Sequence, residues 1–236
     1  MQYQNIVPGI FLSRPNRFIA RVLIDGTETV CHVKNTGRLG ELLLPGSSIL
    51  LEYHRDAAAQ GRKTAYSLIA VYKEAAGFFQ ERLLVNLDSQ APNEAAKEWL
   101  SAGGFSPDVT EVRREVRFHD SRFDLAFLRD GHPAFMEVKG VTLEADGIAS
   151  FPDAPTERGL RHIEELIRAA KEGYEAYMLF VIQMKGIRLF TPNRLRHPAF
   201  ADALLEARAS GVHILARDCH VTETSMNIDG DIPVSL

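Results

Sequence analysis

Cysteine is almost absent from this sequence, which has two among 236 residues. Cys31 and Cys219 lie far apart, so they form neither the close pairs of a zinc site nor the even set of a disulfide framework. Isolated free cysteines are typical of proteins in reducing compartments. This scarcity argues against a disulfide-stapled secreted domain, and we expect a cytoplasmic protein.

Long apolar runs are missing as well. The longest, residues 176–182, is far shorter than the about 20 residues that a membrane-spanning helix needs. Residues 1–18 contain no sustained apolar segment of the length found in signal peptides. We therefore expect a soluble protein with no membrane partner.

Neither sign of charge dominates. The net charge of −4 excludes a uniformly basic nucleic-acid binder, but the charges are unevenly distributed. Residues 1–80 carry nine Lys and Arg against six Asp and Glu, whereas residues 81–236 carry eighteen against twenty-five. A basic segment beside an acidic one that could hold a metal ion fits a phosphate polymer as ligand. A plain mixture of surface charges is the alternative, because the excess is small.

Residues 1–80 have the pattern of short β-strands separated by turns, within an overall composition typical of a folded protein. About five short strands in this length indicate an OB-like β-barrel, a fold that binds oligonucleotides through its open face and loops. Strands are expected at residues 18–24, 29–33, 49–53 and 66–72.

Several aromatic residues of this segment could stack on bases. Aromatic residues in strands more often belong to the core, and that is the interpretation that the pattern favours. The residues concerned are Tyr3, Phe11, Phe18, Tyr53 and Tyr66.

A polar stretch follows the second of these strands. Asn35, Thr36 and Gly37 have the composition of a tight turn, and the cations Lys34 and Arg38 flank them. Backbone amides of such a turn, together with the two cations, could contact phosphate. An ordinary surface turn is the other interpretation, and locally it is the more common one.

Residues 81–236 have a different pattern, in which predicted helices alternate with predicted strands. Asn93 is predicted as the N-cap of a short helix at residues 94–100, which carries Glu98 on its surface. A strand is expected at residues 109–118, a continuously apolar and therefore buried strand at 177–182, another strand at 187–190, and a helix at 199–209. We predict an α/β (α+β) domain of this extent, with a mixed sheet flanked by helices.

Residues 123–143 are the centre of this second domain and read as a β-hairpin. Asp130-Gly131 supplies the turn chemistry, and a two-residue turn there pairs Arg129 with His132 and places Asp124 opposite Glu137, while Pro133 leaves open a register shifted by a residue or two. Like charges at opposed positions destabilise a sheet, and the apolar neighbours suggest that both faces are covered.

A divalent cation would offset that repulsion. Mg²⁺ or Mn²⁺ takes oxygen ligands, commonly two carboxylates completed by waters and a substrate phosphate, so Asp124 and Glu137 are the predicted metal ligands. Lys139 shares a strand face with Glu137 and could hold an attacking water or neutralise charge that develops at phosphorus. An exposed strand face with a Glu/Lys ladder is the alternative at these residues.

A long helix is predicted to begin after Thr156, its expected N-cap, and to bury Leu160, Ile163, Leu166, Ile167 and Ala170. Its first two turns present Arg158, Arg161 and His162 near the positive end of the helix dipole, where a phosphate would be stabilised. Pairing of Arg161 with Glu165 on the helix surface is the other interpretation.

The hairpin motif resembles the active site of the PD-(D/E)XK phosphodiesterase superfamily, and the chain as a whole resembles the SfsA (sugar fermentation stimulation protein A) family. The resemblance implies an N-terminal OB-like domain, a PD-(D/E)XK restriction-endonuclease-like C-terminal domain, DNA as partner and a link to sugar utilisation. It places Asp124, Glu137 and Lys139 at the nuclease-like positions, with Glu98 as the helix acid. The sequence departs from the family pattern at Glu94 and Lys34. The motifs that carry the resemblance are residues 35–39, 85–86, 92–93, 137–143, 151–154 and 156–159, with His162.

Two functions remain open on the sequence alone. One is a metal-dependent nuclease with Asp124, Glu137, Lys139 and Glu98 as its catalytic residues; the other is a DNA-binding regulator that uses the fold as a scaffold. Retention of the clustered charges favours the nuclease, because a pure DNA binder has no need of acids facing a phosphate backbone. The state of assembly is open, with a homodimer as one option.

Overall fold

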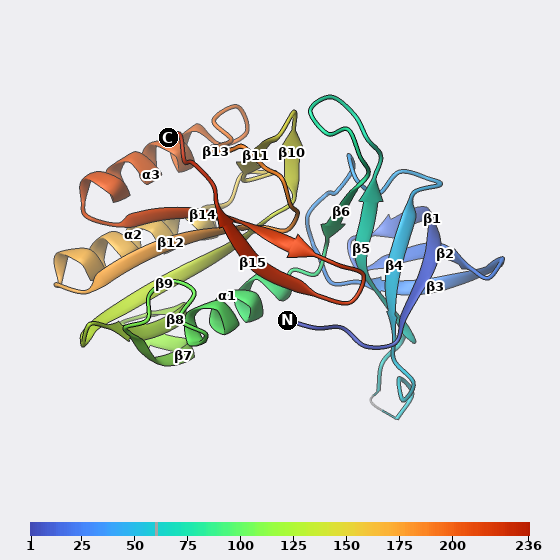
Figure 1. Ribbon diagram of the computed structural model, residues 1–236, viewed down its shortest axis with the longest axis horizontal. Coiled ribbons are helices and arrows are strands. Elements are labelled where there is room, and N and C mark those ends of the chain that lie inside the picture. Colours follow the sequence, from blue (N-terminus) through green and yellow to red (C-terminus); the bar gives the residue numbers. More distant parts are fainter. Residues whose placement is uncertain (60) are drawn as a thin grey trace.

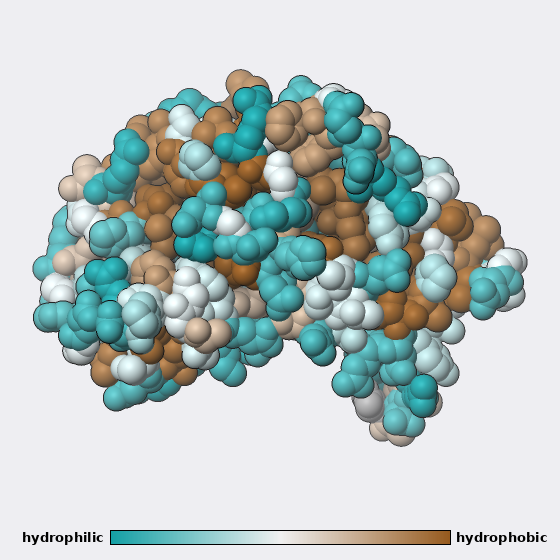
Figure 2. Space-filling view, in the orientation of Figure 1, coloured by the Kyte–Doolittle hydropathy of each residue, from teal (hydrophilic) through white to brown (hydrophobic). Residues whose placement is uncertain are grey.

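The computed structural model describes residues 1–59 and 61–236. Figure 1 shows two halves side by side, a β-rich half and a half in which helices flank a sheet. The space-filling view shows a continuous surface whose outline is hollowed at the lower edge (Figure 2). No helix in the described part of the chain is long and apolar enough to cross a membrane.

The first half is a closed β-barrel. Its strands are β1 (Ile6–Asn16), β2 (Ile19–Ile24), β3 (Thr27–Val33), β4 (Ser48–Tyr53), β5 (Tyr66–Lys73) and β6 (Leu83–Asn86). They are ordered β3-β2-β1-β4-β5-β6, and β3 also pairs with β5 through His32 with Ser67, which closes the barrel. The predicted OB-like barrel is confirmed, and the four expected strands correspond to β2–β5. Strand β1 is absent from the prediction because Pro8, Gly9 and Pro15 interrupt its pattern.

The second half is a mixed sheet in the order β15-β14-β12-β9-β8-β7, flanked by helices as predicted. Its strands are β7 (Val109–Phe118), β8 (Ser121–Arg129), β9 (His132–Val141), β12 (Glu175–Ile182), β14 (His213–Val221) and β15 (Met226–Asp231). A small separate sheet contains β10 (Leu143–Ala145), β11 (Ile148–Phe151) and β13 (Leu189–Pro192). Strands β9, β12 and β14 are parallel to one another.

Helices cover both faces of the larger sheet. They are α1 (Ala91–Ser101), α2 (Glu157–Lys171) and α3 (Pro198–Ala209). Helix α1 packs on the face that contains Met136 and Val138, whereas α2 and α3 pack on the face that contains Phe135 and Phe180. Alternate residues of β9 therefore point into different cores, as the pleat requires. Both faces are apolar and covered, as predicted, so a charge on β9 is partly removed from water.

The helix starts differ in how well they were predicted. Thr156 is the N-cap of α2, and its hydroxyl accepts a hydrogen bond from the backbone N–H of Gly159 at 3.0 Å, which confirms the prediction. Asn93, however, is not the N-cap of α1. The helix begins three residues earlier, after Gln90, because Pro92 fits the first turn, where its missing N–H is not needed.

The other differences are small. Leu160 and Ala170 are only partly buried on α2, where Ala169 is fully buried in their place. The strand predicted at residues 187–190 is β13 and begins two residues later.

Buried polar contacts join the two halves. The side-chain N–H groups of Gln183, which follows β12, donate to the backbone oxygens of Asn86 and Asp88 and to Oδ1 of Asn86, each at 3.1 Å. Lys73 of the barrel pairs with Glu144 of β10, whose side chain is 2% exposed. Because these groups lie away from water, their partners must stay in place, and the interface holds the halves together.

Gln183→Leu should lower the free energy of unfolding by about 1–3 kcal/mol, because it leaves carbonyl oxygens at the interface without donors. Urea unfolding measures the loss. Gln80→Leu is the control at an exposed position and should change stability little. Equal stability of the Gln183 variant and the wild type would contradict the role given to this contact.

Candidate active site

The hairpin formed by β8 and β9 has the predicted register. Arg129 pairs with His132, and the turn residues Asp130 and Gly131 have φ of 49° and 78°. Positive φ at both central residues is the type I′ geometry that suits a two-residue hairpin. The paired ladder ends at Leu125 with Met136, one position before Asp124 and Glu137. The two acids therefore stand where the strands cease to pair.

Asp124 occupies that end of the ladder. Its Oδ2 accepts the backbone N–H of Val138 at 2.8 Å, and its Oδ1 accepts the side-chain amide of Asn93 from α1 at 2.8 Å. The carboxylate thus takes the place of a backbone acceptor and fixes the start of α1 against the sheet. The side chain interpreted as a helix cap from the sequence instead orients the candidate metal ligand.

Glu137 and Lys139 meet His162 of α2 on the other side. The Glu137 side chain is 2% exposed, and its Oε1 lies 2.5 Å from Nζ of Lys139 and accepts from Nδ1 of His162. Nζ of Lys139 also lies 3.0 Å from Nδ1 of His162, and Nε of Arg158 donates to Nε2 of that ring at 3.2 Å. We call Asp124, Glu137, Lys139 and His162 the acid–lysine cluster.

The two acids have opposite electrostatic environments. Burial, followed by the negative charge of Glu137, raises the pKa of Asp124 to about 6. Burial acts in the same direction on Glu137, but the hydrogen bond from His162 and the charge of Lys139 outweigh it, so the pKa of Glu137 is lowered. Glu137 is therefore ionised at neutral pH, and Asp124 is the acid whose charge its surroundings neutralise least.

The donor set fits a hard divalent cation. Two neighbouring carboxylates, one of them with a raised pKa, supply oxygen ligands of the kind that Mg²⁺ and Mn²⁺ prefer, and those ions keep several waters. Among residues 1–59 and 61–236, no group of three or more His, Cys, Asp or Glu is arranged to hold a metal ion by itself. Water or substrate oxygens would have to complete the coordination of an ion at Asp124 and Glu137.

A cleft of about 520 Å³ opens beside the cluster. Asp124 and His162 lie in its wall, together with Arg158 and Arg161 from the first two turns of α2. The helix N-terminus and the guanidinium groups offer contacts to a phosphate, although Glu115, Asp120, Glu164 and Glu165 in the same wall give the cleft more acidic than basic side chains. The predicted helix-end cations thus lie in the same cleft as the candidate metal ligands.

Glu98 does not join the cluster, although the sequence suggested it as the helix acid. Its carboxylate bonds to the N-terminal ammonium of Met1, and its side chain is 49% exposed. Glu98 follows Asn93 by five residues on a helix of 3.6 residues per turn, so the two side chains point about 140° apart around the helix axis. The position of α1 that faces Asp124 is Asn93.

The residue 34–38 loop faces the second half of the molecule. The Arg14 guanidinium donates to the backbone oxygens of Asn35 at 2.5 Å and of Gly37 at 2.7 Å. The N–H of Gly37 is bonded to the Asn35 side chain, and the N–H of Arg38 lies 3.4 Å from a carboxylate oxygen of Asp153. The backbone amides of Gly37 and Arg38, which were predicted to contact phosphate, therefore already have hydrogen-bond acceptors within the protein.

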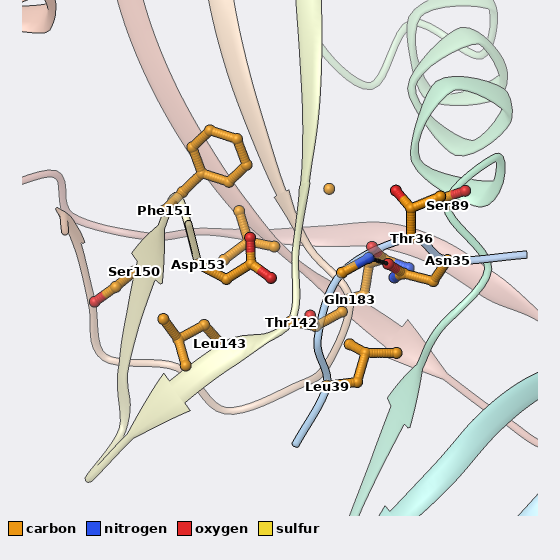
Figure 3. A pocket seen from close by; sticks show the side chains of 13 residues that line it. Asn35, Thr36, Leu39, Ser89, Thr142, Leu143, Ser150, Phe151, Asp153 and Gln183 are labelled. Atoms are coloured by element: carbon orange, nitrogen blue, oxygen red, sulfur yellow. Dashed lines mark hydrogen bonds between the residues drawn. The ribbon is translucent and has the colours of Figure 1, made fainter. Parts of the chain in front are cut away.

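Beside this loop is a cavity of about 210 Å³. Figure 3 shows Asn35 and Thr36 on one side of it and Asp153 and Thr142 on the other. Lys34 lies just before the loop, where its Nζ bonds Oδ2 of the buried Asp88 at 2.8 Å. The loop therefore lies between the halves and not on the outer surface of the barrel.

No local signal in the sequence marks Asp88 or Gln183. Each acts through a partner more than fifty residues away in the chain, Lys34 and Asn86 respectively. Only the assembled interface brings them together.

Comparison with known proteins agrees with this architecture. The family model described as "SfsA N-terminal OB domain" matches residues 12–79, and the one described as "Sugar fermentation stimulation protein RE domain" matches residues 90–225. The chain belongs to the SfsA family. The resemblance noted in the sequence is thereby confirmed.

Individual members of the SfsA family align along the whole chain. A sugar fermentation stimulation protein homolog from Desulfitobacterium hafniense is 50% identical over 236 residues, covering 100% of this chain and 99% of the relative. One from Clostridium beijerinckii is 48% identical and covers 100% of both. The solved structure of Pyrococcus furiosus SfsA in complex with Ca²⁺ superposes with a TM-score of 0.86 at 28% identity, covering 100% of this chain and 98% of that one.

Asp124→Asn should become more stable relative to the wild type as pH rises from 4 to 7.5, although its single amide oxygen can accept only one of the two hydrogen bonds that the carboxylate accepts. The folded-state pKa of Asp124 is raised to about 6, so the stability that its protonated form contributes is present below its ordinary pKa and lost as pH rises through 6. At pH 7.5 the ionised Asp124 therefore destabilises the wild type by on the order of 1–2 kcal/mol, and the variant lacks this destabilisation.

Urea unfolding in a chelator at pH 4, 5, 6 and 7.5 follows the stability difference between variant and wild type, which should shift in favour of the wild type as pH falls toward 4. Asp56→Asn, at an exposed barrel position, is the control and should show no such trend. A variant that is less stable than the wild type by the same margin at every pH would contradict the raised pKa.

Proposed function

We propose that this protein is a divalent-metal-dependent phosphodiesterase that acts on DNA with little sequence specificity. The observation that carries the proposal is the acid–lysine cluster, in which two carboxylates that repel one another lie beside a lysine, next to a cleft whose wall contains Asp124, Arg158 and Arg161. Metal, lysine and phosphate-binding cations are the components that phosphodiester hydrolysis requires.

The proposed metal is Mg²⁺ or Mn²⁺, held by Asp124 and Glu137. The Pyrococcus furiosus relative was solved in complex with Ca²⁺, a hard divalent cation that also takes oxygen ligands, which supports a cation site in this family. A bound ion would polarise the phosphoryl oxygen and lower the pKa of a bound water.

The residues of the chain have distinct roles in this proposal. Asn93 and the N–H of Val138 hold the Asp124 carboxylate in place. Lys139, fixed by Glu137, presents its ammonium group to the attacking water or to negative charge that develops at phosphorus.

Arg158 and Arg161 would bind the phosphates on either side. Arg158 also holds the His162 ring through Nε2, so substrate binding and the orientation of the cluster are linked. Because these contacts reach phosphates and not base edges, they carry no sequence information. Weak sequence preference follows, and the cations of the residue 34–38 loop would add contacts that are equally unspecific.

Mn²⁺ at millimolar concentration should raise the melting temperature of the wild type by several degrees. An ion that binds only the native state stabilises it by about 2.7 kcal/mol at a hundredfold excess over Kd. Asp124→Asn should lose most of the rise in a thermal melt, whereas Glu164→Gln, an exposed acid of the same cleft, should keep it. The same rise in the Asp124 variant would remove the carboxylate pair as the metal site.

Cleavage of DNA with Mg²⁺ or Mn²⁺ is the direct test of the reaction. Lys139→Ala should abolish cleavage yet keep the metal-induced rise in melting temperature, because the lysine acts on the reaction and is not a ligand. Lys171→Ala, at the far end of α2, is the matched control. Glu98→Gln should cleave like the wild type, because Glu98 is bonded to Met1.

Single- and double-stranded DNA are both to be offered as substrates. If the wild type binds DNA but cleaves none with either metal, the non-catalytic, DNA-binding role replaces the phosphodiesterase.

A further inference from the structure

Phe18 is exposed at an ordered turn of the barrel. The turn between β1 and β2 is fixed by Asn16, whose Oδ1 accepts the backbone N–H groups of Phe18 at 2.9 Å and Ile19 at 3.1 Å. The Phe18 ring is nevertheless 56% exposed. The sequence pattern predicts a core strand position for this residue, whereas the structure has it just outside β2. A large apolar ring held open to solvent loses the stabilisation that burial would give it.

A pocket of about 500 Å³ lies against this ring. Ile19 and His32 line its apolar part, and Arg62 and Lys63 supply positive charge. Among the described residues, no Asp or Glu lines it. The Arg62 guanidinium is held by a 2.8 Å bond to Ser67, and its Nε is buried without a hydrogen-bond partner in the described part of the chain. The pocket thus combines an aromatic face with cations that no acid in its wall neutralises.

We propose that this pocket binds a base of single-stranded nucleic acid, stacked on Phe18, with its phosphate near Arg62 and Lys63. Stacking on an aromatic ring beside a cationic groove is how OB barrels hold single strands. Bases inside a duplex are already stacked, so only an unpaired base can present its face to Phe18. The inference deepens the proposed function and rests on it, since it names single-stranded nucleic acid as the form that the barrel engages.

Another hollow of the barrel lacks this combination. Its aromatic residue, Tyr72, is covered by Arg82, whose guanidinium lies 4.0 Å from the ring centroid, and the Tyr72 hydroxyl donates to Glu223 at 2.8 Å. That ring is already engaged, and an acid lies beside it. Phe18 is therefore the better stacking surface of the two.

Binding of short labelled DNA to the full-length protein in a chelator, which prevents cleavage, tests the proposal. Phe18→Ala should weaken binding of single strands about tenfold and leave duplex binding unchanged, whereas Phe18→Tyr should keep the wild-type affinity. Leu44→Ala, which removes another exposed apolar side chain of this half, 54% exposed, is the control. Lys63→Gln should reduce the slope of log affinity against log salt by about 0.7 for single strands.

A 2-aminopurine base in the strand reports stacking directly. Its fluorescence should be quenched by the wild type and by Phe18→Tyr, but not by Phe18→Ala. The exposed Lys63 gives a second variant if Phe18→Ala does not fold.

The outcomes separate this inference from the proposed function. Equal single-strand affinity of Phe18→Ala and wild type, or no single-strand binding by the wild type, would overturn the base pocket even if Asp124-dependent cleavage is found. Phe18-dependent binding without cleavage by any metal-loaded form would support the pocket and overturn the phosphodiesterase.

Discussion

The second half of this protein depends on an ionised carboxylate inside a covered sheet. Glu137 is 2% exposed, and the apolar positions around it pack against helices on both faces. A buried charge without partners is costly, so Lys139 and His162 must be held close to it. That requirement fixes the first turns of α2 against β9 and, through Arg158, the arginine-lined side of the cleft.

The burial of the Asp124 carboxylate is compensated by different contacts. It accepts a backbone N–H where the hairpin ladder ends and an amide from α1, yet its pKa remains raised to about 6. The site is thus incompletely neutralised on the side that faces the cleft. An electrostatic imbalance of this kind is typical of functional sites, where charge is placed for a ligand and not for stability.

Local sequence signals predicted the hairpin and the start of α2 correctly. The Asp130-Gly131 turn determines the pairing of Arg129 with His132, and Thr156 caps its helix, because both depend on neighbours a few residues away. The prediction of Asn93 as N-cap is wrong because Pro92 shifts the start of α1. Glu98 lies on the helix surface, as its spacing favoured, and the catalytic role implied by the resemblance stays a prediction. Lys34 has the local pattern of a free surface cation because its partner, Asp88, is distant in the sequence. Interfaces between halves cannot be inferred from such local patterns.

The central claim is that Asp124 and Glu137 together hold a divalent cation. Diffraction from crystals soaked in Mn²⁺, measured at the manganese absorption edge, locates such an ion without reference to activity. The account predicts an anomalous peak between the two carboxylates in the wild type and none there in Asp124→Asn. A wild-type protein with no peak at these carboxylates, or with its only peak elsewhere, would contradict it.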